Sequence, residues 1–153
     1  MRTFRGAWSL AGLAAGAAGL ATSYFVAMAM TIRESPVVAV AELVIRLTPG
    51  PVAEYLIGLV GKMDKPLLLL GIFVVLGLLF AWAGRLARRT WWAPAVVYAA
   101  LSGVGAVAVS VQRGATINDT VPVAVGFVTW LVTLSLLTEP LRRAELEIGR
   151  AHV

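Results

Sequence analysis

The chain has 153 residues, of which 59% are hydrophobic and only 14% are charged, and its mean hydropathy is +0.87. Soluble domains are about half apolar and a quarter charged, so this composition excludes an ordinary soluble protein. The formal net charge is +5, but the basic residues stand at the ends of apolar runs, as in membrane proteins, and we expect no nucleic-acid partner.

Four uncharged runs are each long enough to cross a bilayer. They lie between Arg5 and Arg33, Lys65 and Arg85, Arg89 and Arg113, and Asp119 and Glu139. A spanning helix needs about 20 apolar residues, and a helix pairs its own backbone groups within lipid. The sequence therefore predicts an all-α membrane protein, whose four-helix transmembrane bundle occupies residues 1–143 in the bilayer. The expected spans are about 7–30, 66–84, 91–112 and 121–138.

The first span contains a pattern of small residues. Gly12, Gly16 and Gly19 follow one another at three- and four-residue intervals, and Gly77 with Ala81 and Ala99 with Gly103 repeat the four-residue spacing. Small residues at this spacing let helix backbones approach closely in lipid. We favour packing within the bundle, and a dimerisation face is the alternative.

The segment after the first span begins with a helix signal. Ser35-Pro36 is typical of an N-cap followed by proline in the first helical turn. A short helix is expected over 36–47, with Glu42 and Arg46 paired across one turn.

A second short helix is expected over 51–61. Thr48-Pro49-Gly50-Pro51 ends the first short helix, and Asp64-Lys65-Pro66 is expected to cap the next span. Both short helices are too short to span, so we expect them to be interfacial, in the first external loop, or packed over the bundle.

The turn between the second and third spans is the strongest topology anchor. Arg85, Arg88 and Arg89 stand close together, and Trp91 and Trp92 follow them. Dense Lys and Arg mark the cytoplasmic side of a membrane, and tryptophan marks the interface. We therefore expect a multi-pass protein of the bacterial plasma membrane with its N-terminus, and the C-terminal end of the bundle, inside.

Residues that could carry chemistry are few. The chain has no cysteine, its one histidine is His152, and no span contains Asp, Glu, Lys or Arg. Histidine-ligated haem, zinc–thiolate sites and Ser-His-Asp catalysis are excluded within this chain, and ion-coupled transport is disfavoured. We therefore expect no catalytic, cofactor-binding or metal residues here.

Polar and aromatic residues within the spans are expected to be structural. Hydroxyls such as those of Ser102, Ser110, Thr129 and Thr133 should bond to the backbone one turn earlier or to a neighbouring helix. Tyr98 and Trp130 should be packing residues.

The last residues, 144–153, form a C-terminal tail. Residues 148–153 back-translate to ATC GGA AGA GCA CAC GTC, the start of a common short-read sequencing adapter whose next triplet is a stop. We expect residues 147–153 to be a library artefact and exclude them from functional reasoning.

The segment Ser35–Ile72 resembles the N-terminal membrane region of actinobacterial molybdopterin-dependent oxidoreductases of the sulfite-oxidase type. The shared elements are Ser35-Pro36-Val37-Val38-Ala39-Val40, Thr48-Pro49-Gly50-Pro51, Asp64-Lys65-Pro66 and Gly71-Ile72. Arg46 and Met63 depart from the family pattern. The resemblance implies that a further span and a catalytic domain follow the bundle, and that this domain binds the molybdenum cofactor through a cysteine.

Three hypotheses about function follow. The first is the membrane-anchor domain of such an oxidoreductase, with the bilayer and its own catalytic domain as partners. The second is a complete four-helix accessory or structural protein, and the third is a small transporter with an uncharged pore. The sequence leaves the oligomeric state, the substrate and the electron acceptor open.

Overall fold

The computed structural model describes residues 2–32 and 35–151, apart from the side chains of residues 2–5, 56, 60, 62 and 64. Within these residues the chain is helical, with no strand. Its elements are α1 (Arg2–Ala29), α2 (Pro36–Leu47), α3 (Gly50–Val60), η1 (Gly61–Met63), α4 (Asp64–Ala87), α5 (Trp92–Ser110), η2 (Ile117–Thr120) and α6 (Val121–Ala151).

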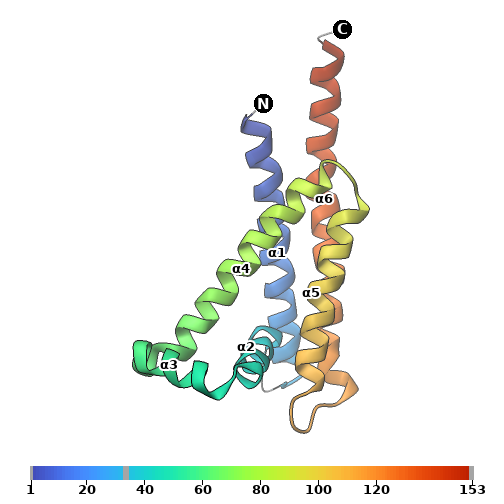
Figure 1. The fold of residues 1–153 in the computed structure, drawn as a ribbon. Helices are drawn as coiled ribbons and strands as arrows, with labels where there is room; N and C mark the ends of the chain where they lie inside the picture. Colours follow the sequence, from blue (N-terminus) through green and yellow to red (C-terminus); the bar gives the residue numbers. More distant parts are fainter. Residues whose placement is uncertain (1, 33–34, 152–153) are drawn as a thin grey trace.

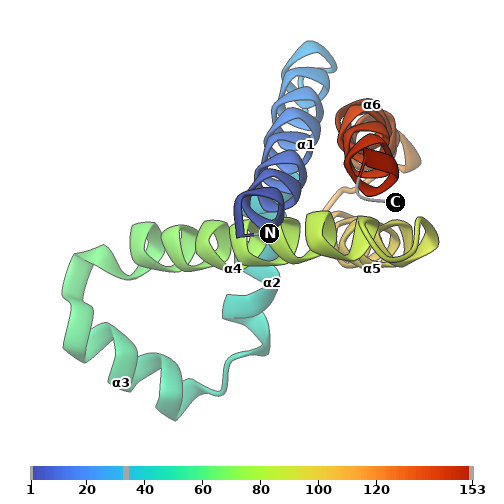
Figure 2. The same cartoon turned by 90° about the horizontal axis from the view of Figure 1, so that it is seen from above.

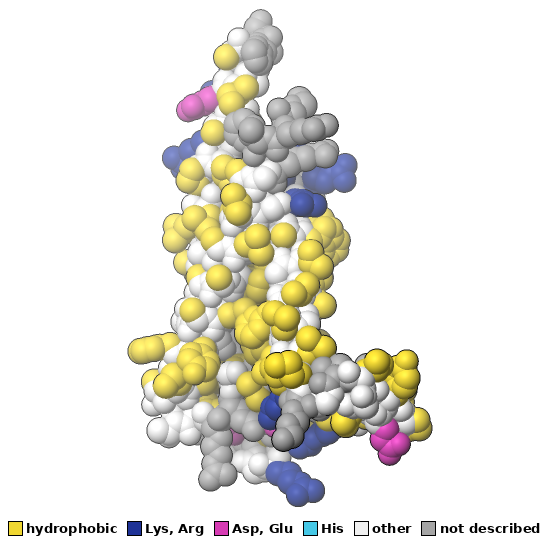
Figure 3. Space-filling view, turned by 90° about the vertical axis from the view of Figure 1, so that its left-hand side faces the viewer, with side chains coloured by type: hydrophobic (Ala, Val, Ile, Leu, Met, Phe, Trp, Pro, Cys, Tyr) yellow, Lys and Arg dark blue, Asp and Glu magenta, His cyan; other side chains and the backbone are white. Residues whose placement is uncertain are grey.

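The four longest helices, α1, α4, α5 and α6, are long and apolar enough to cross a membrane. Figure 3 shows charged side chains toward the two ends of the molecule and hydrophobic side chains between them. Large apolar residues such as Phe25, Leu78 and Leu136 are about 70% exposed (71%, 68% and 69%), as expected of surfaces that face lipid. The chain is therefore an all-α, multi-pass membrane protein.

The helices are not parallel rods. α1 packs along α6 and α4, and α5 packs against α6 and α4. α4 runs obliquely, so that its C-terminal end adjoins α5 while its N-terminal end leaves the bundle (Figure 1). Seen from above, α3 stands away from the other helices (Figure 2).

The core lies where α1, α4, α5 and α6 meet. Its buried members are Trp8, Ala15, Phe80, Ala83, Ala87, Tyr98, Trp130 and Leu134. A second, smaller cluster joins Ala39 of α2 to Ala108 and Val109 of α5 and Val123 of α6. α2 therefore packs over one end of the bundle, whereas the described side chains of α3 are exposed or half-buried.

The two short helices occupy nearly the ranges expected from the sequence. The Ser35 hydroxyl accepts a hydrogen bond from the Val38 amide at 3.5 Å, which identifies Ser35 as the N-cap of α2. α3 ends before Gly61, whose φ of 62° favours glycine because a side chain at positive φ is strained.

Two local expectations were wrong. Instead of pairing with Glu42, Arg46 donates from Nη1 to the Val111 carbonyl oxygen at 3.4 Å. Val111 is the C-cap of α5, and carbonyls at a helix C-terminus lack helical partners and attract cations. The N-cap of α4 is Met63, not Asp64, and no side-chain hydrogen bond caps it, because η1 leads directly into the helix. The Asp64 side chain lies outside the described residues.

α6 continues well past the expected span of 121–138. It has 31 residues, or about 46 Å at 1.5 Å per residue, and contains Pro140. The Arg143 guanidinium lies 3.1 Å from Glu139 Oε1, so an ion pair links the helix across the proline. The C-terminal end of α6 therefore projects beyond the bundle as one helix (Figure 1).

Candidate functional site

The glycines of α1 allow its closest contact with α4. A Cβ atom added to Gly12 would overlap the Phe80 carbonyl oxygen and lie 2.8 Å from the Gly84 Cα, where real Cβ contacts are essentially never below 3.0 Å. A Cβ atom at Gly16 would overlap the Phe80 ring. The structure thus uses these two glycines inside the bundle.

Gly19, the third of these glycines, contacts a tryptophan of α6. A Cβ atom at Gly19 would overlap the Trp130 indole, and the Trp130 Nε1 donates to the Gly16 carbonyl oxygen at 3.0 Å. Gly126 of α6 also approaches α1, because its added Cβ would lie 3.1 Å from the Ser23 Cβ. All three glycines predicted to support packing therefore contact other helices of the same chain.

The glycines of the two other small-residue spacings do not mark close contacts. A Cβ atom at Gly77 would meet its nearest atom, in Leu13, at 3.9 Å, and one at Gly103 would meet nothing within 4 Å. The glycine of α4 that contacts Gly12 is Gly84, which the sequence analysis did not identify. It lies seven residues after Gly77. A search for glycines on one helix face at seven-residue spacing would have found it.

An aromatic cluster fills the space beside these glycines. The ring centroids of Phe80, Tyr98 and Trp130 lie 5.3 to 6.1 Å apart in tilted arrangements, which aromatic pairs favour. Tyr98 is fully buried and its hydroxyl has no hydrogen-bond partner. The rings therefore act as packing residues.

The polar residues of the spans divide into two kinds. The hydroxyls of Ser110 and Thr129 donate to carbonyls one turn earlier, at 2.7 and 2.9 Å, as expected. The expectation was wrong for Ser102, whose buried hydroxyl has no hydrogen-bond partner among the described residues. Ser102 lines a cavity, so no neighbouring helix lies against it to supply a partner.

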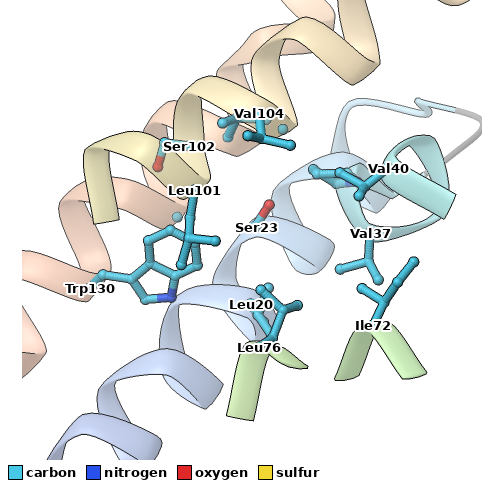
Figure 4. Close-up of a pocket in the computed structure, with 14 residues that line it drawn as sticks. Leu20, Ser23, Val37, Val40, Ile72, Leu76, Leu101, Ser102, Val104 and Trp130 are labelled. Atoms are coloured by element: carbon cyan, nitrogen blue, oxygen red, sulfur yellow. The ribbon is translucent and has the colours of Figure 1, made fainter. Parts of the chain in front are cut away.

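That cavity has a volume of about 90 Å³ and lies between α1, α2, α4, α5 and α6. Figure 4 shows Ser23 between Trp130 and Leu101 on one side and Val37 and Val40 on the other. The lining is apolar except for the serines and the indole, and it contains no ionisable side chain. Such a cavity suits a water molecule or a small uncharged group.

A larger groove adjoins it on the α3 and α4 side. It has a volume of about 620 Å³ and shares Val40, Ile72, Leu76 and Leu101 with the small cavity. Its wall is almost entirely aliphatic. The groove lies where α4 leans away from the bundle, so its surface suits hydrocarbon.

The residues of the family-like segment are brought together only in part. Pro36, Val37 and Val40, from its start, and Ile72, from its end, line the small cavity. Thr48 caps α2, with its hydroxyl donating to the Val44 carbonyl at 2.7 Å. The remaining members shape the turns: Pro49, Gly50 and Pro51 open α3, and Asp64, Lys65 and Pro66 form the first turn of α4.

The predicted topology anchors gather at the opposite end of the bundle. Arg85 and Arg88 lie at the end of α4, Arg89 follows in the turn, and Trp92 begins α5. Trp91 and Trp92 are 52% and 67% exposed. These aromatic side chains are therefore free to lie in a membrane interface.

A carboxylate of α6 links three helices at this end of the bundle. Glu145 Oε1 lies 3.0 Å from the Arg88 Nε and accepts a hydrogen bond from the Trp8 Nε1 at 3.2 Å. α1, α4 and α6 are thus linked by one side chain, which sequence reasoning missed. The sequence does contain a signal for this contact. An acidic residue follows the last span on the same side of the membrane as the three arginines of the turn between the second and third spans.

The described residues contain no cluster of three or more His, Cys, Asp or Glu side chains that could hold a metal ion. The chain matches no protein-family model, no curated protein and no solved structure. The features that this chain offers are therefore a packed interior, an uncharged cavity and an arginine-rich end.

Proposed function

We propose that this chain is the membrane anchor of a molybdopterin-dependent oxidoreductase of the sulfite-oxidase type. The observation that carries the proposal is the resemblance of Ser35–Ile72, whose two ends line one cavity in the structure. The two ends of the segment therefore pack near each other, where α2 and α4 meet.

The interior of the bundle supports an anchoring role. Backbone contact at Gly12 and the aromatic cluster around Trp130 fix the helices by packing, and the buried members of this core carry no Asp, Glu, Lys, Arg or His side chain. A tether needs this kind of interior, because its task is to remain folded in lipid.

The molybdenum cofactor does not fit the donors of this chain. The family holds its metal through a cysteine, and none of the 153 residues is cysteine. We therefore assign the cofactor to a catalytic domain outside this sequence and derive no chemical step for the bundle.

α6 supports the attachment of such a domain. Its C-terminal part stays helical, and Glu145 holds it to Trp8 and Arg88 of the neighbouring helices. A domain that followed this helix would be held at a defined position relative to the membrane. We further propose that this end faces the cytoplasm of a bacterial plasma membrane, so that a fifth crossing would deliver the domain outside.

The longer gene tests the proposal first. We expect the reading frame to continue beyond Leu146 and to encode a further span and a cysteine-bearing domain. A natural stop after Val153, or a continuation without cysteine, would contradict the proposal and favour a separate four-helix accessory protein.

A fractionation experiment tests the anchoring. Residues 1–143 joined directly to the catalytic domain, without the further span, are compared with the catalytic domain alone, and molybdenum is measured in carbonate-washed membranes and in the soluble fraction. The protein with the bundle should hold its molybdenum in the membranes, and the domain alone should leave it in the soluble fraction. The same distribution for both proteins would show that this bundle is not the anchor.

A further inference from the structure

The arginine-rich end contains a hollow that the core does not fill. Its volume is about 980 Å³, and it lies between the start of α1 and the end of α4. Its polar lining consists of Trp8, Ser9, Arg85, Arg88 and Arg89. No packing contact described above explains why three arginines face one space.

Two of these arginines are held in place by neighbouring helices. The Arg85 Nε donates to the Ser9 hydroxyl at 2.7 Å, and the Arg88 Nε lies 3.0 Å from Glu145 Oε1. Both contacts use Nε, so within the described part of the chain the terminal amino groups are available to another partner. Among the described residues, the Arg89 guanidinium contacts no carboxylate.

The hollow therefore has a net positive charge. Glu145 offsets one of the three guanidinium charges and leaves about two. Guanidinium groups bind phosphate oxygens in pairs of hydrogen bonds, and a group of them is suited to a phosphate or phosphodiester.

We propose that this hollow binds the phosphodiester headgroup of an anionic membrane phospholipid. Trp82, Trp91 and Trp92 flank the arginines in sequence and are 52%, 52% and 67% exposed, which is typical of side chains at headgroup depth. Leu10, which also lines the hollow, is 66% exposed and offers an apolar edge to an acyl chain. A soluble phosphate has no use for that edge, and basic pockets at helix ends are known lipid sites.

Lipid titration of the purified chain tests the site. The wild type and R85Q/R89Q are titrated in detergent with phosphatidylglycerol, and bound lipid is counted by native mass spectrometry. Each arginine near an anionic surface contributes five- to sixfold in affinity, so the double variant should bind about 30-fold more weakly. The matched control is R142Q, which removes an exposed arginine of α6 that does not line the hollow.

Further measurements distinguish a lipid headgroup from free phosphate, and a single variant covers the case in which the double variant misfolds. Phosphatidylcholine should bind much more weakly than phosphatidylglycerol, and millimolar inorganic phosphate should not displace the lipid. If R85Q/R89Q misfolds, R89Q alone should bind five- to sixfold more weakly, because Arg89 has no structural partner to lose among the described residues. Equal binding of the two lipids, displacement by phosphate, or an equal loss in R142Q would overturn the proposal.

Discussion

Replacing Gly12 by alanine tests the contact between α1 and α4. The added methyl group would overlap the Phe80 carbonyl oxygen and lie 2.8 Å from the Gly84 Cα. Both obstacles belong to the backbone, so no side-chain rotation relieves them. The two helices must move apart, and the contacts around them must loosen.

The size of the effect follows from a comparison with Gly103→Ala. A Cβ atom at Gly103 meets nothing within 4 Å, so this variant gains the same helix propensity, about 1 kcal/mol, without a clash. Overpacking a close contact costs about 1–3 kcal/mol. G12A should therefore be less stable than G103A by an amount near the top of that range, because backbone cannot yield as a side chain does.

Unfolding by sodium dodecyl sulfate in mixed micelles, followed by circular dichroism, measures the difference. G84A should behave like G12A, because its Cβ would overlap the Trp8 carbonyl oxygen, and the double variant should lose less than the sum of the two. If G12A and G103A unfold at the same detergent fraction, the close approach of α1 and α4 is refuted.

Three further predictions concern single groups and the orientation. Tyr98→Phe should leave stability unchanged or raise it by up to about 1–2 kcal/mol in the same unfolding assay, because it removes a buried hydroxyl without a partner, and a clear loss would reveal an unseen partner. Glu145→Gln should lower the free energy of unfolding by about 0.5–1 kcal/mol, because it removes the ion pair with Arg88. The double variant with R88Q should lose less than the sum of the two single variants, whereas strict additivity would mean that the ion pair contributes nothing. Under the proposed orientation, alkaline phosphatase fused after Thr48 should be active outside the membrane, while a fusion after Arg143 should be inactive; the reverse pattern would overturn the orientation.

The bundle itself could be predicted because lipid restricts the backbone. An uncharged run that is long enough to cross the hydrocarbon must be helical, so its composition alone predicts a transmembrane helix. The α2 helix was equally accessible, since Ser35 and Pro36 act on the residues next to them. Such local rules need no knowledge of the fold.

The contacts between helices could not be predicted in the same way. Small-residue spacing says that a backbone can be approached, but it does not say by which neighbour, so Gly103 looked equivalent to Gly12 although it faces open space. The same limit explains Arg46, whose partner Val111 is 65 residues away. Ser102 was misjudged because its lack of a partner depends on a cavity formed by five helices.

The two ends of the bundle are built differently, and membrane physics explains the difference. Polar links such as Trp8–Glu145 and Arg85–Ser9 occur at the arginine-rich end, where water and headgroups lower the cost of charge that would be prohibitive in hydrocarbon. Beyond Gly12 toward the other end, α4 departs from α1, and an aliphatic groove is lined by α2, α3, α4 and Leu101 of α5. One side chain thus links α1, α4 and α6 at the arginine-rich end, whereas at the other end α2 packs against α5 and α6 and an apolar groove lies beside α4. The arginine-rich end is therefore the part suited to hold a bound headgroup or an attached domain, because side-chain contacts join three helices there.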